Sequence, residues 1–216
     1  MPEESSQPTR GERRRAQTRG RLVAAAEQLF AAQGVEATTI AEITEGADVG
    51  FGSFYNHFDS KDEIAEAVLG EALERQAGGL FELIDPITDP AEVVAVAHSY
   101  LVEQTARNPT FARLLVRLDD SHRLMIRVLG RRARQDILDG VEARRFTTAD
   151  PEVSFFGTGG ALLLVMRAVL DGDLDGDAGV RHCEGLLRML GVADDEAVDI
   201  ARRAAETVKP GSPEGH

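Results

Sequence analysis

The chain has no tryptophan, one cysteine and two lysines among its 216 residues. The single cysteine, Cys183, cannot form an internal disulfide, which excludes a disulfide-stapled secreted domain. The longest uninterrupted apolar run, residues 161–166, is far shorter than the roughly 20 residues of a membrane span. The first twenty residues are polar and lack the apolar core of a secretory signal. We therefore expect a cytoplasmic protein that does not enter a membrane.

Patterns typical of β-strands are also missing, since no run alternates apolar and polar residues and no repeat recurs. Helical spacing and helix-start signals dominate instead. Capping boxes begin at Thr39 and Ser60, and Asp89, Asn108 and Asp150 each precede a proline at the first position of a helix. The chain is predicted to be all-α, with helices at 14–33, from 39, from 60 to about 84, and at 90–107, 109–117, 120–143, 151–171, 178–190 and 195–207.

Residue constellations for catalysis or metal binding are scarce. Five histidines are scattered, and His182 and Cys183 are adjacent on a helix and therefore point in different directions. No phosphate-binding loop is present, and no strand precedes the Gly50-Phe-Gly52 stretch. The aspartates of 171–177 imitate the start of a calcium loop, but His182 stands where the bidentate glutamate belongs, which favours an acidic interhelical loop. We predict no enzyme, catalytic residue, cofactor or metal.

Charge is distributed unevenly. The net charge is −13, yet residues 10–21 hold six arginines against one glutamate, a local balance of +5 that leaves −18 for the rest. A basic segment on an acidic body is typical of a protein that touches a polyanion at one end. A solvated, disordered arm is the alternative reading of the same composition.

The stretch 49–58, VGFGSFYNHF, concentrates aromatic residues between two predicted helices. Its aromatics recur at i, i+3, i+4 and i+7, which is also the pattern of a buried helical face. The preceding turn contains Asp48, which tolerates a left-handed backbone better than most residues. Two short helices joined by a tight turn form the helix-turn-helix layout, whose second helix enters the DNA major groove.

Residues 38–61, with the helix at 14–33, resemble the DNA-binding domain of the tetracycline-repressor family of bacterial transcription regulators. The residues that match in type and spacing are Thr38, Thr39, Ile40, Ala41, Ala47, Val49, Gly52, Tyr55, His57, Phe58 and Lys61. The resemblance implies an N-terminal three-helix helix-turn-helix domain and a larger C-terminal helical ligand-binding and dimerisation domain. The implied boundaries are a disordered basic arm at 1–13, the DNA-binding domain at 14–60, the effector and dimer domain at 61–208 and a disordered tail at 209–216.

The resemblance also implies roles for individual residues. Thr39, Tyr55 and Lys61 would contact phosphates, and Gly52 would let the backbone approach DNA closely. The full predicted DNA-binding set is Thr38, Thr39, Gly50, Phe51, Gly52, Ser53, Tyr55, Asn56, His57 and Lys61. The chain departs from the family pattern at Asp48, Gly50 and Phe51. Gly50 can contact DNA only through its backbone, and Phe51 can pack on a thymine methyl group but cannot hydrogen-bond a base.

One recognition helix reads little DNA, so we expect a homodimer on a palindromic double-stranded operator. The implied dimer interface lies on the helices at 151–171 and 178–190, at Gly157, Gly160, Ala161, Leu164, Val165, Ala168, Leu186, Leu187 and Leu190. The middle helices would enclose a pocket for a largely apolar small-molecule effector. Its predicted lining is Phe81, Tyr100, Phe111, Leu115, Leu118, His122, Met125, Phe155, Thr158 and Met166.

The predicted function is a ligand-responsive repressor in which the effector favours a state that releases DNA, with the helix at 60–84 as the lever. The alternative is a helical interaction or ligand-binding module without specific DNA binding.

Overall fold

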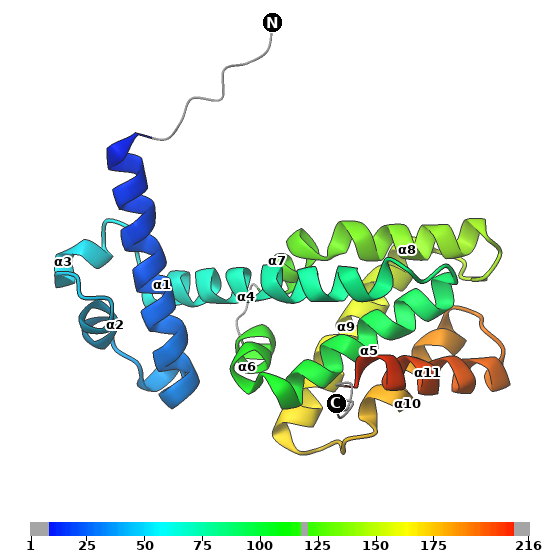
Figure 1. Ribbon diagram of the computed structural model, residues 1–216. Helices are drawn as coiled ribbons and strands as arrows, with labels where there is room; N and C mark the ends of the chain where they lie inside the picture. Colours follow the sequence, from blue (N-terminus) through cyan, green and yellow to red (C-terminus); the bar gives the residue numbers. More distant parts are fainter. Residues whose placement is uncertain (1–8, 118–120, 210–216) are drawn as a thin grey trace, which may run out of the picture. The chain divides into compact units, whose positions relative to one another are not determined.

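The computed structural model describes residues 9–117 and 121–209, and the regular structure in these ranges is helical throughout (Figure 1). The chain forms two compact units that divide between Glu71 and Ala72, inside α4 (Lys61–Ile84). The sequence placed this boundary at the start of the helix. The division lies further along because Ile64, Ala65 and Val68 of the first turns are buried.

The first unit contains α1 (Arg10–Ala37), α2 (Ile40–Gly46) and α3 (Phe51–Phe54). Helix α1 begins four residues before the expected start, because Thr9 and Glu12 form a reciprocal capping box. Arg10 and Arg13, predicted to lie in a disordered arm, are therefore helical. Residues 1–8 of that predicted arm, and the predicted tail beyond Lys209, fall outside the described residues. Gly34, with φ of 83°, interrupts α1 where the sequence indicates a stop.

The turn between α2 and α3 has the conformation that the sequence predicts. Thr39 caps α2, and its capping box with Glu42 is complete. Asp48 takes a left-handed φ of 49°, and Arg21 donates to its backbone carbonyl at 3.0 Å and to its carboxylate at 2.9 Å. Helix α3 is four residues long and ends at its C-cap, Tyr55.

The second unit holds the last turns of α4 and seven further described helices. They are α5 (Pro90–Arg107), α6 (Pro109–Arg117), α7 (Ser121–Val128), α8 (Gly130–Glu142), α9 (Pro151–Asp171), α10 (Ala178–Met189) and α11 (Asp194–Val208). The side chains of Asp89, Asn108 and Asp150 accept the backbone N–H bonds that the cap-plus-proline pattern predicts.

The single helix predicted over 120–143 is wrong. The chain breaks between α7 and α8, at Leu129–Gly130. A Cβ added to Gly130 would lie 3.3 Å from Cζ of Phe155, so glycine permits the close approach of α8 to α9. The break lets both short helices contribute to one cavity, described below.

Helix α5 is the centre of the second unit, and α8, α9, α10 and α11 all pack against it (Figure 1). Leu186, Leu187 and Leu190, predicted to lie at the dimer interface, are buried at 4 %, 0 % and 0 % exposure. They belong to the core of a single chain, because α10 turns its leucine face toward α5 and α11. We therefore exclude these three leucines from the interface proposed below.

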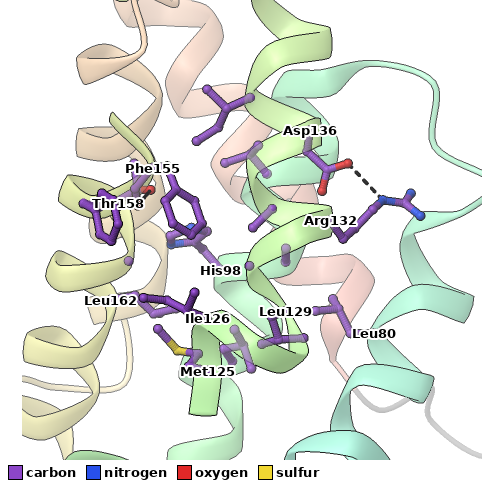
Figure 2. Close-up of a pocket in the computed structure, with 18 of the residues that line it drawn as sticks. Leu80, His98, Met125, Ile126, Leu129, Arg132, Asp136, Phe155, Thr158 and Leu162 are labelled. Atoms are coloured by element: carbon purple, nitrogen blue, oxygen red, sulfur yellow. Dashed lines mark hydrogen bonds and ion pairs between the residues drawn. The ribbon is translucent and has the colours of Figure 1, made fainter. Parts of the chain in front are cut away.

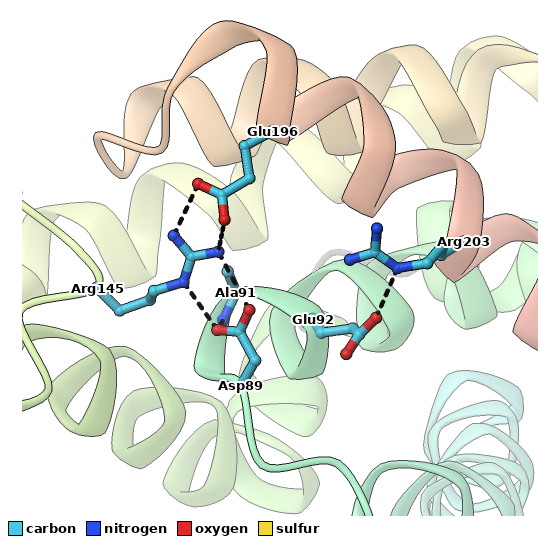
Figure 3. A network of polar contacts seen from close by, with 6 residues as sticks. All are labelled: Asp89, Ala91, Glu92, Arg145, Glu196 and Arg203. Carbon is cyan, nitrogen blue, oxygen red and sulfur yellow. Dashed lines mark hydrogen bonds and ion pairs between the residues drawn. The ribbon is translucent and has the colours of Figure 1, made fainter.

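Arg145, in the loop between α8 and α9, joins two helices through its guanidinium group (Figure 3). Its Nε donates to Asp89 at 2.9 Å, and its Nη2 donates to Glu196 at 2.6 Å. Arg203 and Glu92 add a second bond at 3.0 Å between α11 and α5. Because Asp89 also caps α5, the network secures the start of that helix.

Replacing Arg145 with alanine should lower the free energy of unfolding by about 2 kcal/mol, since it removes charge-assisted bonds from partly buried partners. Burial opposes ionisation of Asp89, but the bonds from Arg145 and the Ala91 N–H bring the pKa of Asp89 below its usual value. A lowered folded pKa stabilises the protein above the unfolded pKa, and this contribution is lost as the pH falls through the folded value.

Urea unfolding of both proteins at pH 7 and near pH 3 tests this prediction. The difference in unfolding free energy should shrink at the lower pH. Arg181→Ala, which removes an exposed pair with Asp175, is the control and should change stability little. An equal loss in the two variants, or a difference independent of pH, would contradict the assigned role of Arg145.

Candidate nucleic-acid interface and effector cavity

Helix α3 is fixed to the first unit by two aromatic anchors. Phe54 and Phe58 are buried, with ring centroids 5.7 Å apart. The guanidinium carbon of Arg19, on α1, lies 5.1 Å from the centre of the Phe58 ring, within the range of a cation–π contact. From the sequence, Phe54 and Phe58 are expected to anchor this helix to the helices at 14–33 and 39–46, and the structure places both rings in the core.

The opposite face of α3 is open. Phe51 and Tyr55 are 55 % and 51 % exposed, unusual values for aromatic side chains, and their rings form an edge-to-face pair with centroids 5.8 Å apart. No atom lies within 4 Å of a Cβ built on Gly50 or Gly52. Within the residues that the structure describes, the Tyr55 hydroxyl has no protein hydrogen-bond partner. The face combines a flat glycine surface with a projecting hydroxyl.

Arginines of α1 border this face. Arg15 Nη2 donates to the backbone carbonyl of Asn56 at 3.2 Å. A shallow polar hollow between the two elements is lined by Gly11, Arg14, Arg15, Thr18, Asn56 and His57. Partial burial, followed by the charges of Arg15 and Arg19, lowers the pKa of His57, which keeps its ring neutral near pH 7. The hollow therefore offers guanidinium groups, an amide and a neutral imidazole.

Arg14, Arg15 and Thr18 were not among the predicted DNA-binding residues. The arginine cluster of 10–21 was the available signal. It could not be placed next to Asn56 without the packing of α1 against the segment that follows α3.

Two predicted DNA contacts form hydrogen bonds within the protein, and the phosphate contact of the half-buried Lys61 stays a prediction. Thr38 is 1 % exposed, and its hydroxyl donates to the Gly34 carbonyl at 2.7 Å, so it cannot reach DNA. The Lys61 ammonium donates to the carbonyls of Glu36 and Thr38 at 3.2 and 3.1 Å, which secures the connection between α1 and α2. Thr39 remains exposed and Ser53 is half-buried.

The second unit contains a largely apolar cavity of about 210 Å³. It is enclosed by the last turns of α4, by α5, and by α7, α8 and α9, and Figure 2 shows part of its lining. Of the ten predicted residues, Phe81, His122, Met125, Phe155 and Thr158 line it. Leu118 lies outside the described residues.

The other four predicted residues lie elsewhere. Phe111, Leu115 and Met166 are core residues with at most 1 % exposure. The Tyr100 hydroxyl donates to Gln76 at 2.8 Å and does not line the cavity. Apolar spacing could not separate these positions from true lining residues, because both kinds face inward on their helices.

The sequence missed a charged pair in the cavity wall. Arg132 Nε donates to Asp136 at 3.0 Å, and its Nη1 donates to Asp85 at 3.1 Å. Burial raises the pKa of Asp136, against the opposing effect of the Arg132 bond. The i,i+4 spacing of Arg132 and Asp136 was a visible signal of pairing, but an exposed pair has the same spacing. A carboxylate in an apolar wall favours a ligand with a hydrogen-bond donor.

Helix α9 presents an exposed apolar stripe on the face opposite its buried side. Val153, Phe156 and Leu164 are 67 %, 57 % and 71 % exposed, and Gly157, Gly160 and Ala161 lie exposed between them. Val165 and Ala168, which were also predicted to lie at the dimer interface, are half-buried. Among the described helices, α9 alone is long and apolar enough to cross a membrane by length and composition, with a mean hydropathy of 1.8. Only 28 % of that apolar window is buried within the chain.

Within residues 9–117 and 121–209, no group of three or more His, Cys, Asp or Glu side chains is placed to hold a metal ion. In the acidic loop that imitates a calcium site, the Asp175 carboxylate accepts bonds from Arg181 and from the Asp177 backbone N–H.

Both units of the chain match family models of known proteins. Residues 22–68 match the family model "Bacterial regulatory proteins, tetR family", and residues 89–203 match "Tetracyclin repressor-like, C-terminal domain". Crystal structures of RolR with and without resorcinol are 36 % and 34 % identical, with TM-scores of 0.80 and 0.76. They cover 88 % and 85 % of this chain and 96 % of RolR.

Curated relatives are transcriptional regulators. The repressor KstR2 of Mycolicibacterium smegmatis is 30 % identical over 57 % of this chain and 56 % of its own length. TcmR of Streptomyces glaucescens is 29 % identical over 62 % and 68 %. The match to KstR2 thus spans about half the length of that relative. The C-terminal model alone matches more than half of the chain, which therefore belongs to the tetracycline-repressor family of transcription regulators.

Proposed function

We propose that the protein is a ligand-responsive transcriptional repressor that binds an operator as a homodimer and is released by a small, largely apolar effector. The observation that carries the proposal is the open face of α3, where Phe51 and Tyr55 project on either side of the flat surface at Gly52, while Phe54 anchors the other face in the core. Such an arrangement leaves a hydroxyl group and an aromatic ring free to contact DNA. Its site of action would be the cytoplasm, where bacterial DNA lies.

DNA binding is supported by the arginines beside α3. The chain carries net negative charge, so the attraction for phosphates must be local, and it is concentrated at the start of α1 next to Asn56 and His57. Phosphate contacts position a protein on DNA, while contacts with base edges give sequence preference. Tyr55 and Arg15 fit the first role, and Phe51 fits the second through contact with thymine methyl groups.

Dimer formation is supported by the exposed stripe of α9. A long apolar helix that is mostly uncovered within one chain requires a partner surface. Two-fold symmetry lets the same stripe meet its own copy, and Gly157 and Gly160 permit close helix approach. The proposed interface therefore consists of the exposed α9 residues.

Effector binding is supported by the cavity and by the similarity to RolR, whose crystal structure contains resorcinol. Apolar walls with a few polar groups are usual for small-molecule sites. The last turns of α4 line the cavity with Leu80, Phe81 and Ile84, while Lys61 at the first turn of the same helix bonds to Glu36 and Thr38. An effector that binds one state more tightly shifts the population, and α4 can carry the change.

The hydroxyl of Tyr55 provides a direct test. Tyr55→Phe should weaken binding to all duplex sequences about tenfold, because it removes one hydrogen bond to a charged phosphate and leaves the ring in place. Fluorescence anisotropy with an operator and with unrelated duplexes measures the effect. Affinity of the unmodified protein should also fall steeply with salt.

Phe51→Ala serves as the contrasting variant. It should change the ratio between operator and unrelated DNA, whereas Tyr55→Phe should leave that ratio unchanged. If the unmodified protein binds no duplex even at low salt, the alternative of a helical interaction module replaces the repressor.

A further inference from the structure

Two histidines from different helices meet behind the cavity wall. His98 Nδ1 of α5 and His182 Nε2 of α10 lie 2.9 Å apart, a hydrogen-bond distance. His98 lines the cavity and His182 does not. The sequence drew attention to His182 as a neighbour of Cys183 and as the residue at the glutamate position of the imitated calcium loop, and the pair with His98 was not predicted. Since Nδ1 of His98 points to α10, Nε2 is the nitrogen of its ring that remains for the cavity.

The bond restricts how protons are arranged on the two rings. In a neutral pair one imidazole donates and the other accepts. When His98 Nδ1–H donates to His182, His98 Nε2 is an acceptor. When His182 Nε2–H donates to His98, His98 Nε2 carries a proton and is a donor. The tautomer of His98, and so the hydrogen-bonding character of its Nε2, is therefore coupled to the tautomer of His182.

The charges in the cavity wall favour a neutral ligand over an anion. Burial, with a smaller effect of His182, lowers the pKa of His98 to about 3, so the ring is neutral at physiological pH. The Arg132 guanidinium contacts two carboxylates, Asp85 and Asp136. These groups offer no excess positive charge to hold an anion. Figure 2 shows Arg132 and Asp136 on one side of the view and His98, Phe155 and Thr158 on the other.

We propose that His98 Nε2 hydrogen-bonds a hydroxyl group of a neutral, hydroxylated ring compound, and that His182 is a positioning residue that fixes the tautomer of His98. This inference rests on the proposed effector role of the cavity and specifies its ligand. In this arrangement the apolar walls contact the ring of the ligand, and Asp136 accepts a hydrogen bond from one hydroxyl group. His98 Nε2 forms a hydrogen bond with a second hydroxyl group. A compound with two separated hydroxyl groups satisfies both.

Calorimetry of the full chain with resorcinol, phenol, benzene and benzoate tests this assignment. Resorcinol should bind more tightly than benzene or benzoate. His98→Phe should weaken resorcinol binding about tenfold, because one hydrogen bond is lost, and should leave benzene binding unchanged or tighter. His182→Leu should weaken resorcinol binding about threefold, and His182→Gln, which can donate or accept, should restore most of it.

Glu184→Leu, a polar-to-leucine change on the same helix, is the control and should leave resorcinol affinity unchanged. Thermal unfolding of every variant tests whether the fold is retained. Unchanged resorcinol affinity in His98→Phe would overturn the assignment, as would benzoate binding as tight as that of resorcinol. Failure of all four compounds to bind would also overturn it.

Nitrogen-15 NMR of the histidine rings distinguishes a pair that takes part in ligand binding from a pair that only stabilises the fold. The His98 ring, whose pKa burial lowers to about 3, should remain neutral down to pH 5. Resorcinol should shift the Nε2 signal of His98. A merely structural pair would keep that signal unchanged when resorcinol binds, which would contradict the proposal. DNA binding is measured on the unliganded protein, so a failure there bears on the repressor function and not on the histidine pair.

Discussion

A glutamate in place of Leu164 should convert the protein to a monomer and weaken operator binding at least about 100-fold. Leu164 is 71 % exposed within one chain and is the last exposed apolar residue of the α9 stripe. Burying a leucine contributes about 1.5–3 kcal/mol, and a two-fold interface contains the residue twice. Two buried carboxylates at the same place would oppose association. Sedimentation equilibrium gives the mass, and anisotropy gives the operator affinity.

Leu138→Glu is the matched control, since Leu138 is a 40 % exposed leucine of α8 and is not part of the proposed α9 interface. It should leave both the mass and the operator affinity unchanged. A dimer that persists in Leu164→Glu would place the interface elsewhere. An unmodified protein that is monomeric, or that partitions into lipid vesicles through α9, would reject the proposed role of the stripe.

Side chains added at Gly52 should block DNA binding without harming the fold. No atom lies within 4 Å of a Cβ at this position, so leucine fits the isolated protein. In the proposed complex the same space is filled by the DNA backbone. Gly52→Leu should weaken binding about 100-fold, or about 2.7 kcal/mol, with Gly52→Ala intermediate. The melting temperature should stay the same or rise slightly, because glycine is a poor helix former.

Gly78→Leu is the control for this series. Gly78 is exposed on α4, and it also has no atom within 4 Å of an added Cβ. Its replacement should leave operator affinity unchanged. If Gly52→Leu binds DNA as tightly as the unmodified protein, the open face of α3 is not the surface that meets DNA.

The fold was largely predictable, because its signals are local. Thr39, Asp89 and Asp150 mark helix starts through side-chain acceptors that the structure confirms. The start of α1 and the break at Gly130 were missed for different reasons. Thr9–Glu12 is a capping box inside a segment whose arginines suggested disorder. Gly130 packs closely against Phe155, which is distant in the sequence, so no local pattern indicates the contact.

The site was less predictable, because it depends on contacts between distant segments. The residues of α3 could be assigned by their spacing, but the burial of Thr38 and the bonds of Lys61 depend on how α1 ends. In the cavity, helical periodicity identifies inward residues and cannot tell core from lining. His98 and His182 are 84 residues apart, so no local pattern connects them.

Selection of DNA from a random duplex library by the full chain tests the central claim most directly. The account predicts that an inverted repeat is enriched, with half-site centres about 34–36 Å or a multiple of that spacing apart. Tyr55→Phe should enrich the same sequence at lower yield. Recovery of no preferred sequence, or of a single site without two-fold symmetry, would contradict a dimeric repressor that reads its operator with α3.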